Sequence, residues 1–241
     1  MNMKEFESRI SDSKLETFNP ETDLTPVANL YAQVFAGPPW NEYTVCSGCE
    51  KFSGLSTNPG EDCTSCGKML TLAYPVEKTK NYIIKDANRD DAVGFIMKIN
   101  SELAGFVWGY SYDSVDDFVN EKYKTSDMKS GIRELLANNG IVNKFFYFSE
   151  IGVREDQRGK GFSNFLSGLL LKEAREKNLP VIMRTNWQSP MIVVANNFGM
   201  IQIMGPHVEI DRNSRKITNT GQVVNNFMDS EIGERVLFVI R

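Results

Sequence analysis

Two kinds of apolar pattern alternate along the chain. Alternating or continuous apolar runs rich in aromatic and β-branched residues predict strands, and apolar residues at steps of three and four predict helices. Strands are expected near 14–18 and at 93–99, 102–112, 145–153, 179–185, 201–204 and 235–240. Helices are expected from Asp23 or Thr25 to Gly37, from Pro75 to Asp86, over 162–174 and over 189–199. Strands alternating with helices indicate one α/β or mixed α+β domain.

Two segments depart from this alternation. The charged segment 115–139 has its apolar residues at helical spacing, which predicts a helical insertion. The segment 44–68 is rich in Gly, Ser, Thr, Asn, Asp and Cys and has few large apolar residues, so it cannot build its own hydrophobic core. Before both of them, the polar residues up to Asn19 predict a loosely held lead-in, and Asn100-Ser101 predicts a tight turn between two strands.

Composition narrows the class of protein. Apolar content of 41% and charged content of 24% are ordinary for a globular protein, and no apolar run is long enough to cross a membrane. The first residues, MNMKEFESRI, lack an apolar stretch after their charges, so no secretory signal and a cytoplasmic location are expected. The 27 basic and 31 acidic residues give a net charge of −4, which argues against a large nucleic-acid footprint and favours cationic ligands.

A basic glycine loop, QRGKG (157–161), separates the strand 145–153 from the helix that follows it. Backbone N–H groups and the helix dipole favour an anion at such a place, and glycines let the backbone approach it closely. The alternative is an ordinary helix start with solvated basic side chains. A Walker loop would need glycine where Arg154 stands, and a dinucleotide fingerprint would need glycine where Asn164 stands, so both are excluded.

The stretch Arg158-Gly159-Lys160-Gly161-Phe162-Ser163 resembles the acetyl-CoA motif of the GNAT superfamily of N-acetyltransferases, with Ser163 in place of the last small residue. The resemblance continues through 150–179, 30–43 and 188–200. It implies a mixed α/β GNAT-like domain over 14–241, with a mostly antiparallel central sheet that splays between its fourth and fifth strands and is flanked by helices. The segments 44–68 and 115–139 would be insertions in it.

The resemblance also implies a cosubstrate, acetyl-CoA, and the residues that hold it. Backbone groups of Ile151 and Val153 would pair with the pantetheine arm where the two strands splay. Backbone N–H groups of the stretch from Arg158 to Ser163, which comprises Gly159, Lys160, Gly161 and Phe162, would hold the pyrophosphate. Asn186 would reach the cofactor arm, unless it only forms a turn.

Glu150 is the candidate general base. Acyl transfer to an amine needs the amine uncharged, and a carboxylate can take its proton directly or through water. Burial in an apolar strand would raise the pKa of Glu150 and suit it to this step. The alternative is a carboxylate that only organises the site. Many members of the family have a tyrosine that protonates the leaving thiolate, and the corresponding residue here is Ala195.

All four cysteines fall in two CxxC pairs, Cys46/Cys49 and Cys63/Cys66, separated by thirteen residues. Two residues between thiols let one turn present both sulfurs to one ion, and four thiolates complete the tetrahedral shell of a structural Zn²⁺. Disulfides are the alternative, which a cytosolic compartment disfavours. The predicted zinc ribbon lies between the first two helices, so we expect a metal-stapled lid or a substrate-recognition element.

The expected function is therefore acetyl-CoA-dependent N-acetylation. The acceptor is an amine, either a small cationic molecule, as the acidic balance favours, or a protein or peptide amine; a homodimer is one arrangement that the sequence allows. The alternatives are a non-catalytic acyl-CoA sensor, which Ala195 favours, and an adaptor that binds nucleic acid or protein through its ribbon.

Overall fold

The computed structural model describes residues 13–211, 214, 216–225 and 235–241. The expected lead-in and the expectation that there is no secretory signal concern residues 1–12, which lie outside the described part of the chain. The described residues form two compact units. Among them, unit 1 contains 13–88, 94–107 and 151–162, and unit 2 contains 89–93, 108–150 and those from Ser163 onward.

Unit 1 begins with β1 (Ser13–Thr17) and α2 (Pro20–Ala36). The helix starts earlier than the sequence predicts: the side chain of Asn19 caps it by accepting a hydrogen bond of 3.0 Å from the backbone N–H of Glu21. Pro20 then occupies the first turn, where no backbone N–H is needed. Pro26, which marks the predicted start, lies inside the helix instead.

A hairpin of β5 (Val93–Ile99) and β6 (Glu102–Tyr112) follows α3 (Val76–Ala87) in the chain. Its turn residues Asn100 and Ser101 have φ of 49° and 67°, so the predicted tight turn is confirmed. β1 pairs with β5 in antiparallel register. Lys98 strengthens this edge, because its ammonium lies 2.6 Å from a Glu16 carboxylate oxygen and 3.4 Å from one of Asp23.

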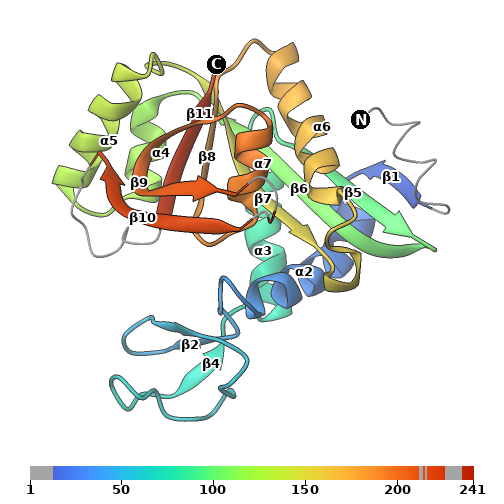
Figure 1. Ribbon diagram of the computed structural model, residues 1–241. Helices are drawn as coiled ribbons and strands as arrows, with labels where there is room; N and C mark the ends of the chain where they lie inside the picture. Colours follow the sequence, from blue (N-terminus) through green and yellow to red (C-terminus); the bar gives the residue numbers. More distant parts are fainter. Residues whose placement is uncertain (1–12, 212–213, 215, 226–234) are drawn as a thin grey trace. The chain divides into compact units, whose positions relative to one another are not determined.

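A separate small sheet lies between α2 and α3 in the chain (Figure 1). Its strands are β2 (Thr44–Cys46), β3 (Phe52–Ser53) and β4 (Leu70–Leu72), in the order β3-β2-β4. β2 is antiparallel to both neighbours. This sheet is the ribbon that carries the cysteines, and we refer to residues 44–72 as the ribbon.

Unit 2 contains β6 from Trp108, β7 up to Glu150 and the strands that follow them in the main sheet, in the order β6, β7, β8, β11, β9 and β10. Beside β6 these are β7 (Phe145–Val153), β8 (Val181–Asn186), β11 (Arg235–Ile240), β9 (Ile201–Ile210) and β10 (Ile217–Val224). β7 and β8 are parallel, and β8 with β11, β11 with β9, and β9 with β10 are antiparallel. β9 extends beyond the predicted strand 201–204, and β10 was not predicted.

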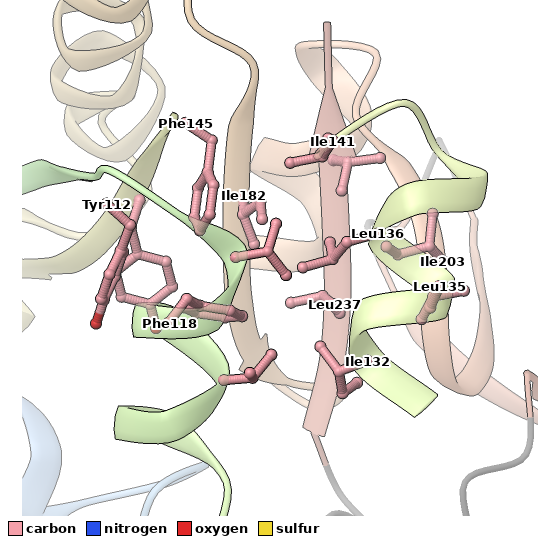
Figure 2. Packing of buried hydrophobic residues seen from close by; sticks show 14 of the residues in the cluster. Tyr112, Phe118, Ile132, Leu135, Leu136, Ile141, Phe145, Ile182, Ile203 and Leu237 are labelled. Atoms are coloured by element: carbon pink, nitrogen blue, oxygen red, sulfur yellow. The ribbon is translucent and has the colours of Figure 1, made fainter. Parts of the chain in front are cut away.

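The segment 115–139 is helical, as expected, and forms α4 (Val115–Lys122) and α5 (Ser126–Asn138). Both pack on the sheet of unit 2 (Figure 2). Leu136 and Ile132 of α5 face Leu237 of β11, and the ring of Phe118 lies 5.4 Å from that of Phe145. The remaining helices are α6 (Phe162–Glu176) and α7 (Met191–Asn197). No helix in the described part of the chain is both long and apolar enough to cross a membrane.

A polar network also fixes α4 in unit 2. Glu121 forms an ion pair with Arg89 and accepts a hydrogen bond of 2.9 Å from the hydroxyl of Tyr112. The Arg89 guanidinium lies 4.3 Å from the ring centroid of Tyr110, within cation–π range. Burial alone would raise the pKa of Glu121, but Arg89, Lys122 and Tyr112 outweigh it and lower that pKa to about 2.

Candidate functional site

The glycine loop has the geometry that the sequence predicts. A short 3₁₀ turn, Glu155–Gln157, follows β7, and α6 begins at Phe162. Gly159 and Gly161 have φ of 78° and 91°, a backbone region that strains residues with a Cβ. The first turn of α6 contains no acidic residue, so its N–H groups and dipole remain suited to an anion. The donors present fit the pyrophosphate of acetyl-CoA.

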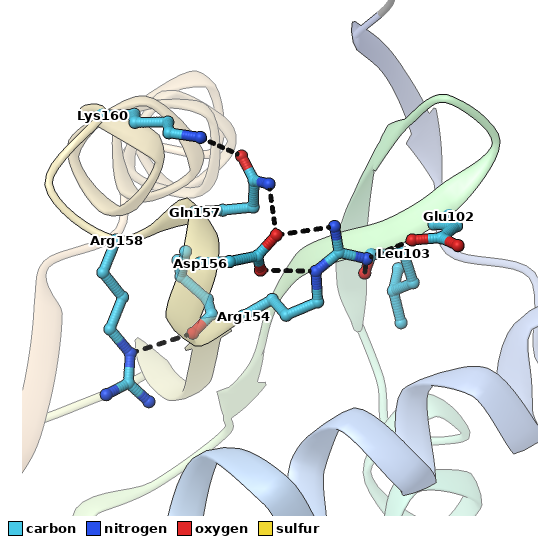
Figure 3. A network of polar contacts seen from close by, with 8 residues as sticks. Glu102, Leu103, Arg154, Asp156, Gln157, Arg158 and Lys160 are labelled. Atoms are coloured by element: carbon cyan, nitrogen blue, oxygen red, sulfur yellow. Dashed lines mark hydrogen bonds and ion pairs between the residues drawn. The ribbon is translucent and has the colours of Figure 1, made fainter.

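The side chains of this loop are held by one another (Figure 3). Lys160 donates a hydrogen bond of 2.8 Å to Gln157, and the Nε of Arg158 donates one of 3.3 Å to the backbone oxygen of Val153. The structure therefore brings Arg158 to the predicted pantetheine-binding residue Val153. Phe162 is buried, so its side chain belongs to the core.

The parallel pairing of β7 with β8 is short. It comprises Phe146–Val181, Tyr147–Ile182 and Phe148–Met183, although both strands continue beyond these residues. Over 149–151 the strand is half-buried, whereas the sequence led us to expect Glu150 to be buried in an apolar strand. Ile151 and Val153, which the family resemblance implies would pair with a cofactor arm, lie beyond the last of these pairs.

Glu150 lies at this point of β7 and is half-buried. An arginine that the sequence analysis did not single out is its electrostatic neighbour: Arg184, on β8, one residue past the last parallel pair. Burial lowers the pKa of Arg184, but Tyr147, Tyr123 and Glu150 outweigh it and raise that pKa. The Arg184 guanidinium also lies 5.7 Å from the ring centroid of Tyr123. A fixed positive charge thus accompanies the candidate base.

Two other predicted positions lie in unit 2. Asn186 is buried at the end of β8, and its side-chain oxygen accepts a hydrogen bond of 2.8 Å from the backbone N–H of Gln188. This contact is the one expected of a turn-forming asparagine. Ala195, the residue where many family members have tyrosine, is buried in α7. Ser163 is half-buried in the first turn of α6.

The four cysteine sulfurs converge in the ribbon. All lie within 4.8 Å of one another, with 3.3 Å between Cys46 and Cys66 and 3.7 Å between Cys49 and Cys63. Four thiolates at the usual Zn–S distance of about 2.3 Å would be separated by about 3.8 Å. The cysteines are free thiols, so the disulfide alternative is not the arrangement seen. The donor set and its spacing fit a structural Zn²⁺.

Backbone groups around these sulfurs favour thiolates. The N–H groups of Gly48 and Cys49 point at the sulfur of Cys46, at 3.3 Å and 3.5 Å, and that of Ser65 points at Cys63. The N–H groups of Cys49 and Gly48 lower the pKa of the Cys46 thiol to about 6. Such amide-to-sulfur bonds hold the sulfurs of a metal knuckle in place.

A carboxylate that the sequence did not point to lies at the root of the ribbon, by which we mean Glu42, Tyr43, Ala73 and Tyr74 on either side of it. Glu42 is 8% exposed, and the hydroxyl of Tyr74 donates a hydrogen bond to it. The ring of Tyr74 lies 5.0 Å from that of Tyr31 and 6.0 Å from that of Phe35. Tyr31 in turn stacks at 6.0 Å on Phe106. A buried acid therefore borders an aromatic cluster in unit 1.

This aromatic cluster reaches β7 next to the predicted pantetheine-binding residues. A Cβ on Gly152 would lie only 2.4 Å from the ring of Phe106, so the glycine is needed for the two to pack. Gly152 stands between Ile151 and Val153. The sequence offered no signal for this proximity, because it depends on contacts between distant segments.

No family model and no curated protein matches the sequence. Similarity to proteins of known structure extends over nearly the whole chain. Polyamine N-acetyltransferase of Drosophila melanogaster is 10% identical with a TM-score of 0.52, and covers 95% of this chain and 100% of its own. An agmatine N-acetyltransferase is 12% identical with a TM-score of 0.51, and covers 95% of this chain and 99% of its own. Together with the splayed parallel pair and the glycine loop, these likenesses show that the chain has the fold of the GNAT acetyltransferases.

Proposed function

We propose that this protein is an N-acetyltransferase that moves the acetyl group of acetyl-CoA to an amine. The observation that carries the proposal is the glycine loop, whose two positive-φ glycines lead into a helix without acidic residues in its first turn. This loop follows directly on the strand that ends its parallel pairing early. The resemblance to the GNAT superfamily implies the same roles for these two features, which supports the proposal.

Acetyl-CoA is the acyl donor in this proposal. Backbone N–H groups of residues 158–163 hold its pyrophosphate, and backbone groups of Ile151 and Val153 pair with the pantetheine arm. The thioester carbon is then attacked by the neutral amine nitrogen. The C–N bond forms, the C–S bond breaks, and the electron pair leaves with the sulfur as coenzyme A thiolate.

Glu150 takes the proton that the amine must lose, directly or through a water molecule, and passes it to solvent. Half-burial leaves this carboxylate a route to water. The leaving thiolate has no tyrosine at Ala195 to protonate it. A thiol has a reference pKa of about 8.5, so the thiolate is a tolerable leaving group and water can supply its proton.

The acceptor is an amine that carries a positive charge. Glu42 and the rings of Tyr31, Phe35 and Tyr74 combine a buried carboxylate with aromatic faces, the chemistry that attracts organic cations. The net charge of −4 favours the same ligands. Agmatine and polyamines, which the similar proteins acetylate, are accordingly the first acceptors to test.

The ribbon serves acceptor recognition in this proposal, and Zn²⁺ holds it in shape. Four thiolates, Cys46, Cys49, Cys63 and Cys66, would bind the ion, and a reducing cytoplasm would keep them available. Phe52 of the ribbon stacks at 6.5 Å on Tyr74, which connects the metal-stapled sheet to the hydrogen bond at its root.

The second candidate function is an acyl-CoA sensor that binds the thioester without turning it over. Ala195 favours it, because the usual acid is absent. One experiment separates the two: purified protein is incubated with acetyl-CoA and agmatine, a polyamine or a peptide with a free α-amine. Acetylated amine together with an equal amount of coenzyme A supports the enzyme, and bound but unconsumed acetyl-CoA supports the sensor.

A further inference from the structure

Arg154, the residue directly after β7, forms hydrogen bonds with residues of the loop and of β6 (Figure 3). Its Nε and Nη2 donate hydrogen bonds of 2.7 Å and 3.1 Å to the two carboxylate oxygens of Asp156. Its Nη1 donates to Glu102 at 2.9 Å and to the backbone oxygen of Leu103 at 3.2 Å. Its backbone N–H donates to Ala104 at 2.9 Å. One residue therefore ties the glycine loop to the start of β6.

The same contacts continue into the loop as a relay. Asp156 accepts a hydrogen bond of 2.7 Å from the side chain of Gln157, and Gln157 accepts one of 2.8 Å from Lys160. Gln157 is buried, so this central link is shielded from solvent. Arg154, Asp156, Gln157 and Lys160 thus form one chain of side chains from the strand to the glycines.

The relay neutralises a negative charge near the proposed pyrophosphate site. Asp156 lies in the 3₁₀ turn Glu155–Gln157, two residues before the stretch 158–163 that the proposed function assigns to a pyrophosphate, and its carboxylate would repel that anion. The bidentate contact with Arg154 neutralises this charge and directs both carboxylate oxygens toward the guanidinium. The backbone also depends on it, because the N–H of Gln157 donates a hydrogen bond of 2.9 Å to the backbone oxygen of Arg154.

We propose that Arg154 is a positioning residue for the diphosphate of acetyl-CoA: it masks the charge of Asp156 and sets the shape of the glycine loop without touching the cofactor. The inference rests on the proposed function, because it assumes that the loop holds this diphosphate. It gives Arg154 a task distinct from that of Arg158, whose guanidinium is anchored only through Nε to Val153 among the contacts that the structure describes.

The test compares two ligands, of which only one carries the diphosphate and the adenosine 3′-phosphate attached to it. Dissociation constants are measured by calorimetry for acetyl-CoA and for S-acetylpantetheine, which has the thioester arm but none of these groups. Arg154→Met should weaken acetyl-CoA binding about tenfold, the size of one lost charge-assisted contact. Acetylpantetheine binding should stay within about twofold of the wild-type value, because uncharged ligands do not sense Asp156.

Further variants test whether Arg154 acts by masking the charge of Asp156. Asp156→Asn alone should weaken acetyl-CoA binding less than Arg154→Met does, and the double variant Arg154→Met/Asp156→Asn should recover most of the loss. Arg154→Lys should be intermediate, since it keeps the charge but not the bidentate fork. Glu102→Gln changes the exposed partner of Arg154, 74% exposed, and should have little effect.

Three results would overturn the inference. Arg154→Met could bind acetyl-CoA as tightly as the wild type, it could weaken both ligands equally, or the Asp156→Asn change could fail to restore binding. Melting temperatures measured on the same samples identify a variant that has lost its fold, and Arg154→Lys then decides the question. Wild-type protein that binds no acetyl-CoA would instead contradict the proposed function itself.

Discussion

The hydroxyl of Tyr74 donates a hydrogen bond to the carboxylate of Glu42, and these two residues flank the whole ribbon. Glu42 precedes β2 and Tyr74 follows β4. The bond therefore joins the chain segment that enters the ribbon to the segment that leaves it. The N–H of Ala73 donates a further bond of 3.0 Å to the oxygen of Tyr43 at the same place. Tyr74 therefore belongs both to the aromatic cluster of unit 1 and to the hydrogen bonds that close the ribbon.

Tyr74→Phe should test this root. The substitution removes a hydroxyl donor from a buried carboxylate, which costs about 1–3 kcal/mol of unfolding free energy. We expect the acceptor Michaelis constant to rise while that for acetyl-CoA is unchanged. Steady-state kinetics and urea denaturation measure the two effects, and Tyr43→Phe, one residue from Glu42, is the matched control. Equal changes in both Michaelis constants would contradict a role in acceptor recognition.

Gly159→Val tests the glycine loop against a matched glycine elsewhere. Gly159 and Gly221 both have φ of 78°, and a Cβ at either would meet nothing within 4 Å. Valine should therefore cause similar strain at both places, about 1–2 kcal/mol. Only Gly159→Val should weaken acetyl-CoA binding, measured by calorimetry, because only this residue shapes the pyrophosphate loop. Equal acetyl-CoA binding by the two variants would show that the glycine loop does not bind the cofactor.

Metal removal should unfold the ribbon and leave the sheet intact. Its buried core consists of Cys46, Cys63 and Leu70, with Cys49 packed against them, so cysteines supply most of it. Chelation should accelerate hydrogen exchange of amides in 44–72 and leave those of α6 protected. Cys49→Ser should act like the chelator, whereas Ser65→Ala should not. Unchanged exchange after verified loss of zinc would show that the ribbon holds itself together.

The sequence predicts the elements that a local pattern encodes, and it misses those that depend on contacts with distant segments. The strand 145–153, the glycine loop, the cysteine pairs and the helical segment 115–139 are encoded by local patterns, and the structure contains them all. β10 was missed because ITNTGQVV is mostly exposed and polar, and its pairing with β9 supplies the strand that its composition does not.

The start of α2 and the contacts of the site show the same limit. Pro26 looks like the start of a helix, but the capping bond of Asn19 lies seven residues earlier. Glu42 and Tyr74 are 32 residues apart in the sequence, and Arg154 and Glu102 are 52 apart. No local pattern identifies such partners, whereas the glycine loop and the two CxxC pairs are each contained in a few consecutive residues.

Acid should weaken unit 2 through Glu121. Its pKa is lowered from 4.5 to about 2 in the folded protein, so its stabilising contribution is complete above pH 4.5 and is lost as the pH falls toward 2. Glu121→Gln should lower the unfolding free energy by about 2 kcal/mol at pH 7 and flatten its decline in acid. Urea denaturation at pH 7, 5 and 3.5 measures this.

The control for that experiment is Glu134→Gln, an exposed acidic residue on the neighbouring helix α5. It should follow the wild-type curve at every pH. A variant at Glu121 that loses stability in acid as steeply as the wild type would show that the pair with Arg89 does not set the acid sensitivity.

Acetyl transfer to an amine can be measured in one assay. Zinc-loaded wild-type protein and its Glu150→Gln variant are incubated with acetyl-CoA and agmatine, and mass spectrometry follows acetylated amine and free coenzyme A together. We expect equal amounts of both products from the wild type, and much slower turnover by the variant at unchanged acetyl-CoA affinity. Acetyl-CoA that binds but is not consumed with agmatine, polyamines or a peptide amine would contradict this expectation.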